Sequence, residues 1–144
     1  ASAEEEGLRR LDAALLQIAT LRFPDEALVR QTVDQVGSEL RFGDDPFLSG
    51  FMYRYRRQDD FGHPKSAFLI CSFWWIQALA KTGQLERARL AMKNAMRAAN
   101  AIGLFAEHYL PNTHVQTGNF PQAYSHVGQI NAAFAVSPPW DDIL

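Results

Sequence analysis

Hydrophobic residues recur at the three-to-four-residue spacing of an α-helix along most of the chain. The pattern predicts an amphipathic helix over residues 3–22 and a second one that begins at Pro24 and Asp25 and ends near Leu40. A proline followed by acidic residues is typical of a helix start, because the first turn needs no proline N–H and its free N–H groups attract negative charge. Each of these helices is expected to bury a single face.

Two further helices distribute their hydrophobic residues differently. Residues 66–80 are apolar nearly all round, which predicts an inner helix with neighbours on more than one face. Residues 85–102 carry one apolar stripe with charged residues opposite, which predicts an outer helix packed on one side. Gly83 and Gly103 follow these segments, where a helix end favours a residue that tolerates left-handed backbone geometry.

A final helix is predicted to open at Asn119, with Pro121 in its first turn, and to stop before Pro138. Two long loops, residues 41–65 and 104–118, separate the helices, and loops of this length are more often functional than idle. No strand alternation and no parallel βα pattern is found, so the fold class is predicted to be all-α. Alternating inner and outer helices in antiparallel pairs indicate part of a toroid of helical hairpins.

Composition indicates one ordinary domain and excludes several classes of function. The 144 residues are 47% hydrophobic and 12% aromatic, which is enough for a packed core. The net charge is −2 and the basic residues are scattered among acidic ones, so nucleic acid is not an expected partner. No apolar run reaches the roughly 20 residues needed to span a bilayer, so the protein is expected to be soluble, without a membrane association.

Cysteine and histidine spacing indicates no metal site and no cofactor. The four histidines and Cys71 show no metal-ligand spacing, and Cys71 falls within an apolar helix where a small core residue is expected. A single cysteine excludes an internal disulfide framework and is compatible with a reducing, cytoplasmic location. The stretch from Ala1 to Gly7 is acidic and lacks the features of a secretory signal.

Both loops contain residues that could act on a sugar. The first carries Tyr53, Arg54 and Tyr55, and flat aromatic faces with planar guanidinium donors are typical of sugar sites. The second carries Glu107 among apolar neighbours, where a carboxylate can serve as general acid or base. On spacing alone, a solvated basic loop and a surface or capping glutamate remain the alternatives.

Several blocks of sequence resemble glycoside hydrolase family 15, the glucoamylase and trehalase family, in their order and spacing. The most specific block runs from Gly118 to His126 and follows a loop glutamate at short distance. The blocks that carry the resemblance are residues 11–16, 52–55, 67–74, 83–91, 106–108 and 118–126.

This resemblance implies an (α/α)6 barrel, of which residues 1–144 would form the C-terminal segment of the catalytic domain. Enzymes of the family release glucose from the non-reducing ends of α-glucans, or split trehalose, with inversion. The expected substrate is therefore an oligosaccharide or disaccharide of glucose.

Site residues follow from the same resemblance. Glu107, in a string of alanine, glutamate, histidine and tyrosine, matches the family's general base, and Arg54 matches an arginine that binds sugar hydroxyls. Tyr124 corresponds to an aromatic residue packed near the base. Tyr53 and His126 are further substrate-binding candidates because they lie close to these motifs.

One part of the family's machinery has no match in this sequence. The general acid of the family lies in a tryptophan-glutamate motif well upstream of the block at residues 11–16. Glu4, Glu5 and Glu6 have no tryptophan beside them, and they are predicted to form a solvated helix start. The acid is therefore expected on an N-terminal part that these residues do not include.

An open arc of helices leaves apolar edges bare, so the expected partner is the N-terminal half of the same protein or a second copy. The alternative function is a non-catalytic glucoamylase-like module with a regulatory or interaction role. An unrelated helical repeat is disfavoured, because no fixed period is found.

Overall fold

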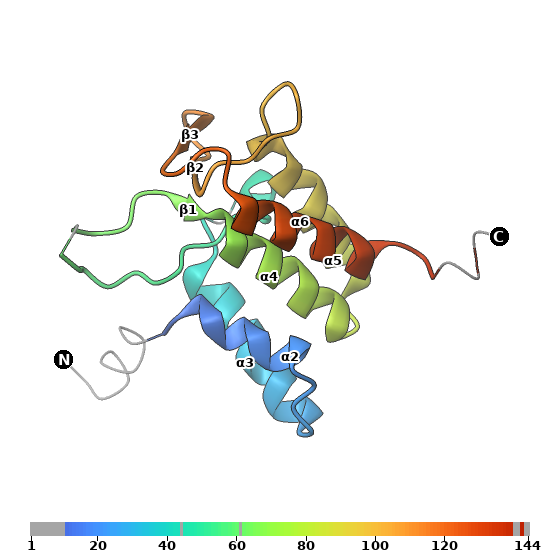
Figure 1. Ribbon diagram of the computed structural model, residues 1–144. Helices are drawn as coiled ribbons and strands as arrows, with labels where there is room; N and C mark the ends of the chain where they lie inside the picture. Colours follow the sequence, from blue (N-terminus) through green and yellow to red (C-terminus); the bar gives the residue numbers. More distant parts are fainter. Residues whose placement is uncertain (1–10, 44, 61, 140–141, 143–144) are drawn as a thin grey trace.

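The computed structural model describes residues 11–43, 45–60, 62–139 and 142, and most of this part is helical (Figure 1). The helical elements are η1 (Ala13–Leu16), α2 (Gln17–Thr20), α3 (Glu26–Leu40), η2 (Pro46–Leu48), α4 (Leu69–Lys81), α5 (Leu85–Ala95), η3 (Met96–Ala98) and α6 (Ala123–Val136). The strands are β1 (Ala67–Phe68), β2 (His108–Leu110) and β3 (Val115–Thr117). The prediction of a mainly α-helical fold is confirmed.

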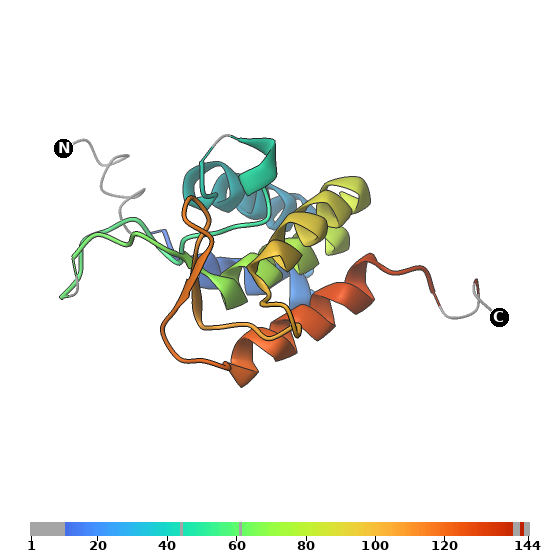
Figure 2. The ribbon, with the colours of Figure 1, turned by 90° about the horizontal axis from the view of Figure 1, so that it is seen from above.

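The helices pack around α4. Figure 1 shows α2, α4 and α6 running in similar directions. Figure 2, seen from above, shows α3 and α5 on the side of α4 that faces away from α6. Helix α4 contacts α2, α3, α5 and α6, and ten of its residues are buried. The predictions of an inner helix for α4 and a one-sided outer helix for α5 agree with this arrangement.

Close packing at two glycines sets the distances between the helices. A Cβ on Gly37 of α3 would lie 2.2 Å from Cη2 of Trp75, so the α3 backbone packs directly on the indole. A Cβ on Gly128 of α6 would lie 2.6 Å from Cδ1 of Ile70, so α6 lies close to α4. The indole N–H of Trp75 donates to the Ser49 carbonyl at 3.2 Å and ties the first long loop to α4.

Asp25 starts α3 as the sequence predicts. Its side chain accepts a hydrogen bond from the Leu28 N–H at 2.9 Å, which satisfies one of the free donors of the first turn. The predicted helix over residues 3–22 is described only from residue 11, where η1 and α2 form a short helical segment. Residues 3–10 lie outside the described part.

The absence of strands was a wrong prediction. Three short strands form an antiparallel sheet in the order β1-β2-β3, with Ala67 paired to Tyr109 and His108 to Thr117. Strands of two or three residues are too short to show alternation. The sheet fastens the second long loop to the start of α4.

Three helix boundaries also differ from prediction. Helix α4 begins at Leu69 and not at residue 66, because residues 67–68 form β1. The helix predicted to reach Ile102 ends at η3, because Ala99 is extended, and Ile102 is 78% exposed. The last helix starts at Ala123 and not at Asn119, because Gln122 has extended backbone angles and its N–H donates to the Phe105 carbonyl. Pro121 therefore precedes the helix, joined to Phe120 by a cis peptide bond.

Helix α6 exposes a stripe of large hydrophobic side chains. Its opposite face is buried at Ser125, Gly128 and Ala132. The exposed side chains, which follow one another at helical spacing, are Tyr124 (46% exposed), Val127 (55%), Ile130 (50%) and Phe134 (62%). The described surface therefore has the apolar flank that the sequence predicts.

Candidate active site

The two long loops and the small sheet meet at the end of the molecule where α4 and α6 begin (Figure 1). A pocket of about 520 Å³ lies between them. It is lined by Arg54, Tyr55, Asp59, Gly62, His63, Pro64, Lys65, Ser66, Phe68, Glu107 and His108. The structure thus brings Arg54 and Glu107, two of the predicted site residues, to one pocket.

The backbone of Glu107 is fixed from two sides. Its N–H donates to the Asn119 carbonyl at 2.9 Å, and its carbonyl accepts from the Leu69 N–H at 3.1 Å, at the start of α4. The preceding carbonyl, of Ala106, accepts from the buried Ser125 hydroxyl at 2.8 Å. Glu107 is therefore held between α4, α6 and the segment that follows β3.

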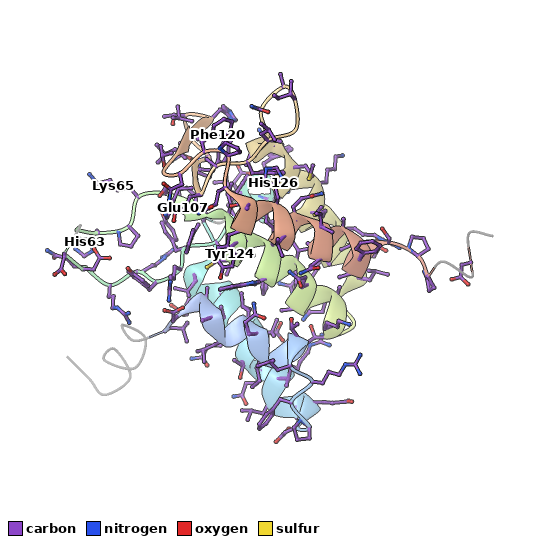
Figure 3. All side chains as sticks on the ribbon, viewed as in Figure 1. His63, Lys65, Glu107, Phe120, Tyr124 and His126 are labelled. Atoms are coloured by element: carbon purple, nitrogen blue, oxygen red, sulfur yellow. The ribbon has the colours of Figure 1, made fainter. Side chains whose placement is uncertain are left out.

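The Glu107 side chain is half-buried and held through one oxygen. Oε2 accepts from the Asn119 backbone N–H at 3.3 Å and from its side-chain Nδ2 at 3.2 Å. Among the described residues Oε1 has no hydrogen-bond partner. In Figure 3, Glu107 lies between the loop with His63 and Lys65 and the start of α6 with Tyr124 and His126.

His108 forms part of the pocket wall next to Glu107. Its ring stacks on Phe68 with centroids 4.7 Å apart, and its Nδ1 lies 3.1 Å from the Ser66 hydroxyl. Burial lowers the pKa of His108, although the Glu107 carboxylate and a backbone hydrogen bond at Ala67 act in the opposite direction. The imidazole is therefore neutral at neutral pH.

Arg54 is oriented by the N-terminal segment. Its Nε lies 3.3 Å from Oδ2 of Asp12, and its carbonyl accepts from the Ala13 N–H at 2.8 Å. Asp12 also caps η1 through Oδ1, which accepts from the Ala14 N–H. Burial opposes ionisation, but the Asp12 carboxylate, together with Cys71 and Tyr55, acts in the opposite direction, and the pKa of Arg54 is raised. The guanidinium is therefore a fixed cation.

The other three predicted site residues do not line the pocket formed by the described residues. Tyr53 stacks on Phe42 at 4.7 Å. His126 accepts a hydrogen bond from the Phe105 N–H at 3.2 Å, which is a structural contact. Tyr124 packs edge-on against Trp74 at 6.1 Å and belongs to the exposed stripe of α6.

Sequence reasoning missed three residues that organise the site. The sequence pattern predicts a helix start at Asn119, a family motif that includes Asp12, and the beginning of a helix at Ser66. Their partners are 12, 42 and 42 residues away in the chain, so no local pattern could have revealed them.

Other chemistry has little support in the part of the chain that is described. No group of three or more metal-ligating side chains is placed to hold an ion there. Cys71 is buried, which raises the pKa of its thiol to about 12, so it is a poor nucleophile. No helix within the described ranges is long and apolar enough to cross a membrane.

Comparison with known proteins identifies the family of the chain. The family model for glycosyl hydrolases family 15 matches residues 2–134. The chain belongs to this family.

Curated relatives share the same stretch of sequence. The chain is 36% identical to a trehalase of Mycobacterium tuberculosis, over 90% of this chain and 19% of that protein. It is 36% identical to a trehalase of Mycolicibacterium smegmatis, over 88% and 19%, and 34% identical to one of Thermoplasma acidophilum, over 88% and 21%. The chain thus spans about a fifth of the length of these relatives. No solved structure matches it.

Proposed function

We propose that this chain supplies the general-base side of the active site of an inverting α-glucosidase. In this proposal Glu107 activates the attacking water and Arg54 binds hydroxyls of the glucosyl unit. The observation that carries it is the pocket that Glu107 and Arg54 share, although they are far apart in the sequence.

The environment of Glu107 suits a general base. An inverting glycosidase needs one carboxylate to activate water and a carboxylic acid about 6.5–9.5 Å away to protonate the leaving oxygen. Glu107 has one oxygen held by Asn119, while Oε1 has no partner among the described residues and can accept a proton from water. One oxygen of the carboxylate is thus held in place, and the other is available to a water molecule.

The general acid is proposed to lie outside these 144 residues. Among the described residues, the other carboxylate that lines the pocket is Asp59, which accepts a hydrogen bond from the Tyr55 hydroxyl at 2.5 Å. We do not assign the acid to Asp59, because its carboxylate is already engaged. An N-terminal part of the same protein would bring the acid and complete an (α/α)6 barrel, with residues 1–144 as its C-terminal segment.

Trehalose is the substrate that the relatives favour, because three trehalases align with nearly the whole chain. Terminal glucosyl units of α-glucans remain the other candidate. Both present hydroxyls that a guanidinium can bind. A cytoplasmic location is part of the proposal and is supported by the free thiol of Cys71.

The test uses a longer polypeptide in which these residues are joined to the part encoded upstream of Ala1 in the same reading frame. That upstream part should contain a tryptophan-glutamate motif. This polypeptide should release glucose from trehalose, maltose or starch, and Glu107→Gln should lower kcat by about 10²–10⁴-fold. Glu86→Gln is the matched control, because Glu86 is exposed on α5 and forms only a surface ion pair with Arg89. No glucose release, or full activity of Glu107→Gln, contradicts the proposal.

A non-catalytic module is the second reading, and sugar binding separates the two. The enzyme should bind glucose or an acarbose-like inhibitor, and Arg54→Ala should weaken that binding. A protein that neither binds these sugars nor releases glucose would support the regulatory or interaction role instead.

A further inference from the structure

We propose that Asn119 is the positioning residue that orients the Glu107 carboxylate to deprotonate the attacking water. This inference rests on the proposed function, since it takes Glu107 as the general base. Asn119 contacts Glu107 and does not line the pocket, so it would act through Glu107 alone.

Three contacts join the two residues. Asn119 accepts from the Glu107 backbone N–H, and it returns two donors, its own N–H and Nδ2, to Oε2. Two donors on one oxygen fix the carboxylate plane and leave the second oxygen for a water molecule. No other residue of the described part donates to this carboxylate.

Gly118 packs against the oxygen of the carboxylate that Asn119 holds. A Cβ at this position would lie 2.8 Å from Oε2 and 3.0 Å from Cβ of Glu107. The backbone of residues 118 and 119 therefore forms a wall directly against the Glu107 side chain. Together with the two hydrogen bonds, this wall limits Glu107 to a narrow range of orientations.

Restricted orientation has a consequence for the rate. A general base contributes to catalysis only when its oxygen is within hydrogen-bond reach of the water it deprotonates. Losing the side-chain donor would let the carboxylate rotate, which lowers kcat. It would leave KM nearly unchanged, because Asn119 is not expected to touch the substrate.

The experiment compares Asn119→Ala and Asn119→Asp in the active longer polypeptide. Alanine removes the donor, and we expect a loss in kcat of about 10- to 100-fold at constant KM. Aspartate keeps the size of the side chain but places a second carboxylate against Oε2, so its loss should be larger. Asn119 is exposed, so both variants should fold, as thermal unfolding will check.

Asn112→Asp is the matched control, because Asn112 is an exposed asparagine in the β2–β3 hairpin that precedes Asn119. It should keep wild-type kcat. A double variant separates a positioning role from a merely structural one. With Glu107→Gln present, Asn119→Asp should cause no further loss of the residual rate.

Two failures are distinguishable. If Glu107→Gln is fully active, the proposed function itself is wrong. If Glu107→Gln is inactive while Asn119→Asp keeps wild-type kcat, or if the two losses simply multiply in the double variant, only the positioning role of Asn119 is overturned.

Discussion

His108 links the chemistry of the pocket wall to stability. Its ring is partly buried between Phe68 and the Ser66 hydroxyl, and burial lowers its pKa below the usual value of 6.5. The unfolded chain therefore binds a proton at a higher pH than the folded protein does. Stability contributed by the neutral ring is present above pH 6.5 and falls as the pH drops below it.

We predict that His108→Asn makes the fold less sensitive to acid. The variant loses the stacking contact with Phe68, so its Tm should be lower than that of the wild type at pH 8. Between pH 8 and pH 5 its Tm should fall less than that of the wild type, because the variant has no imidazole at position 108 whose protonation destabilises the fold. Thermal unfolding by circular dichroism at both pH values measures this. His63→Asn, in the exposed part of the loop, should behave as the wild type; parallel curves for wild type and His108→Asn would contradict the prediction.

Gly118 offers a second prediction at the scale of single residues. Gly118→Ala places a methyl group 2.8 Å from Oε2 of Glu107, at a φ of +78°. We expect a loss in kcat of at least about tenfold, because the base must move, together with a loss of about 1 kcal/mol in stability from backbone strain.

Gly83→Ala separates the two causes. Gly83 has almost the same φ, +76°, but nothing lies within 4 Å of its missing Cβ. The control should show the strain in its free energy of unfolding and keep wild-type kcat. Equal kcat in both variants would mean that Gly118 does not constrain Glu107.

At the scale of elements, the contact between α3 and α4 depends on one glycine. Gly37 lies in the last turn of α3, where alanine would gain up to about 1 kcal/mol in helix propensity. The Trp75 ring lies only 2.2 Å from the added Cβ, so overpacking should cost about 1–3 kcal/mol and outweigh that gain. Gly37→Ala should therefore be destabilised in urea unfolding. Ser38→Ala, on the exposed face, should change stability by less than about 0.5 kcal/mol, and a stabilised Gly37→Ala would refute this packing argument.

Helices could be predicted where their own sequence contains the signals that form them. Asp25 caps α3 within a few residues of its partner, and the apolar residues of α4 indicate burial on every side. The start of α6 could not be predicted, because Gln122 is held extended by the distant Phe105 carbonyl. The same limit applies to the site: a local motif indicates Glu107, whereas Asn119 becomes its partner only through the hairpin.

For the whole molecule, the proposed site and the exposed surface both lead us to expect that another segment packs against these residues. The pocket holds a candidate base without an assigned acid, and α6 exposes a stripe of Tyr124, Val127, Ile130 and Phe134. Apolar patches of this kind are uncommon on monomers unless another surface covers them. A single additional segment packed on α6 could cover the stripe and bring the acid to the pocket.

We therefore predict that the 144 residues alone self-associate through this stripe when no other segment covers it. Sedimentation velocity should show a mass that rises with concentration. The double variant Ile130→Lys with Phe134→Lys should stay monomeric, since two charges on the stripe cannot be buried against a second copy without a large desolvation cost. Leu90→Lys changes a residue that is similarly exposed, at 48%, but lies on the outer helix α5, so it should associate as the wild type does. A wild-type chain that is monomeric at every concentration, or a double variant that still associates, would show that the stripe is not an interface.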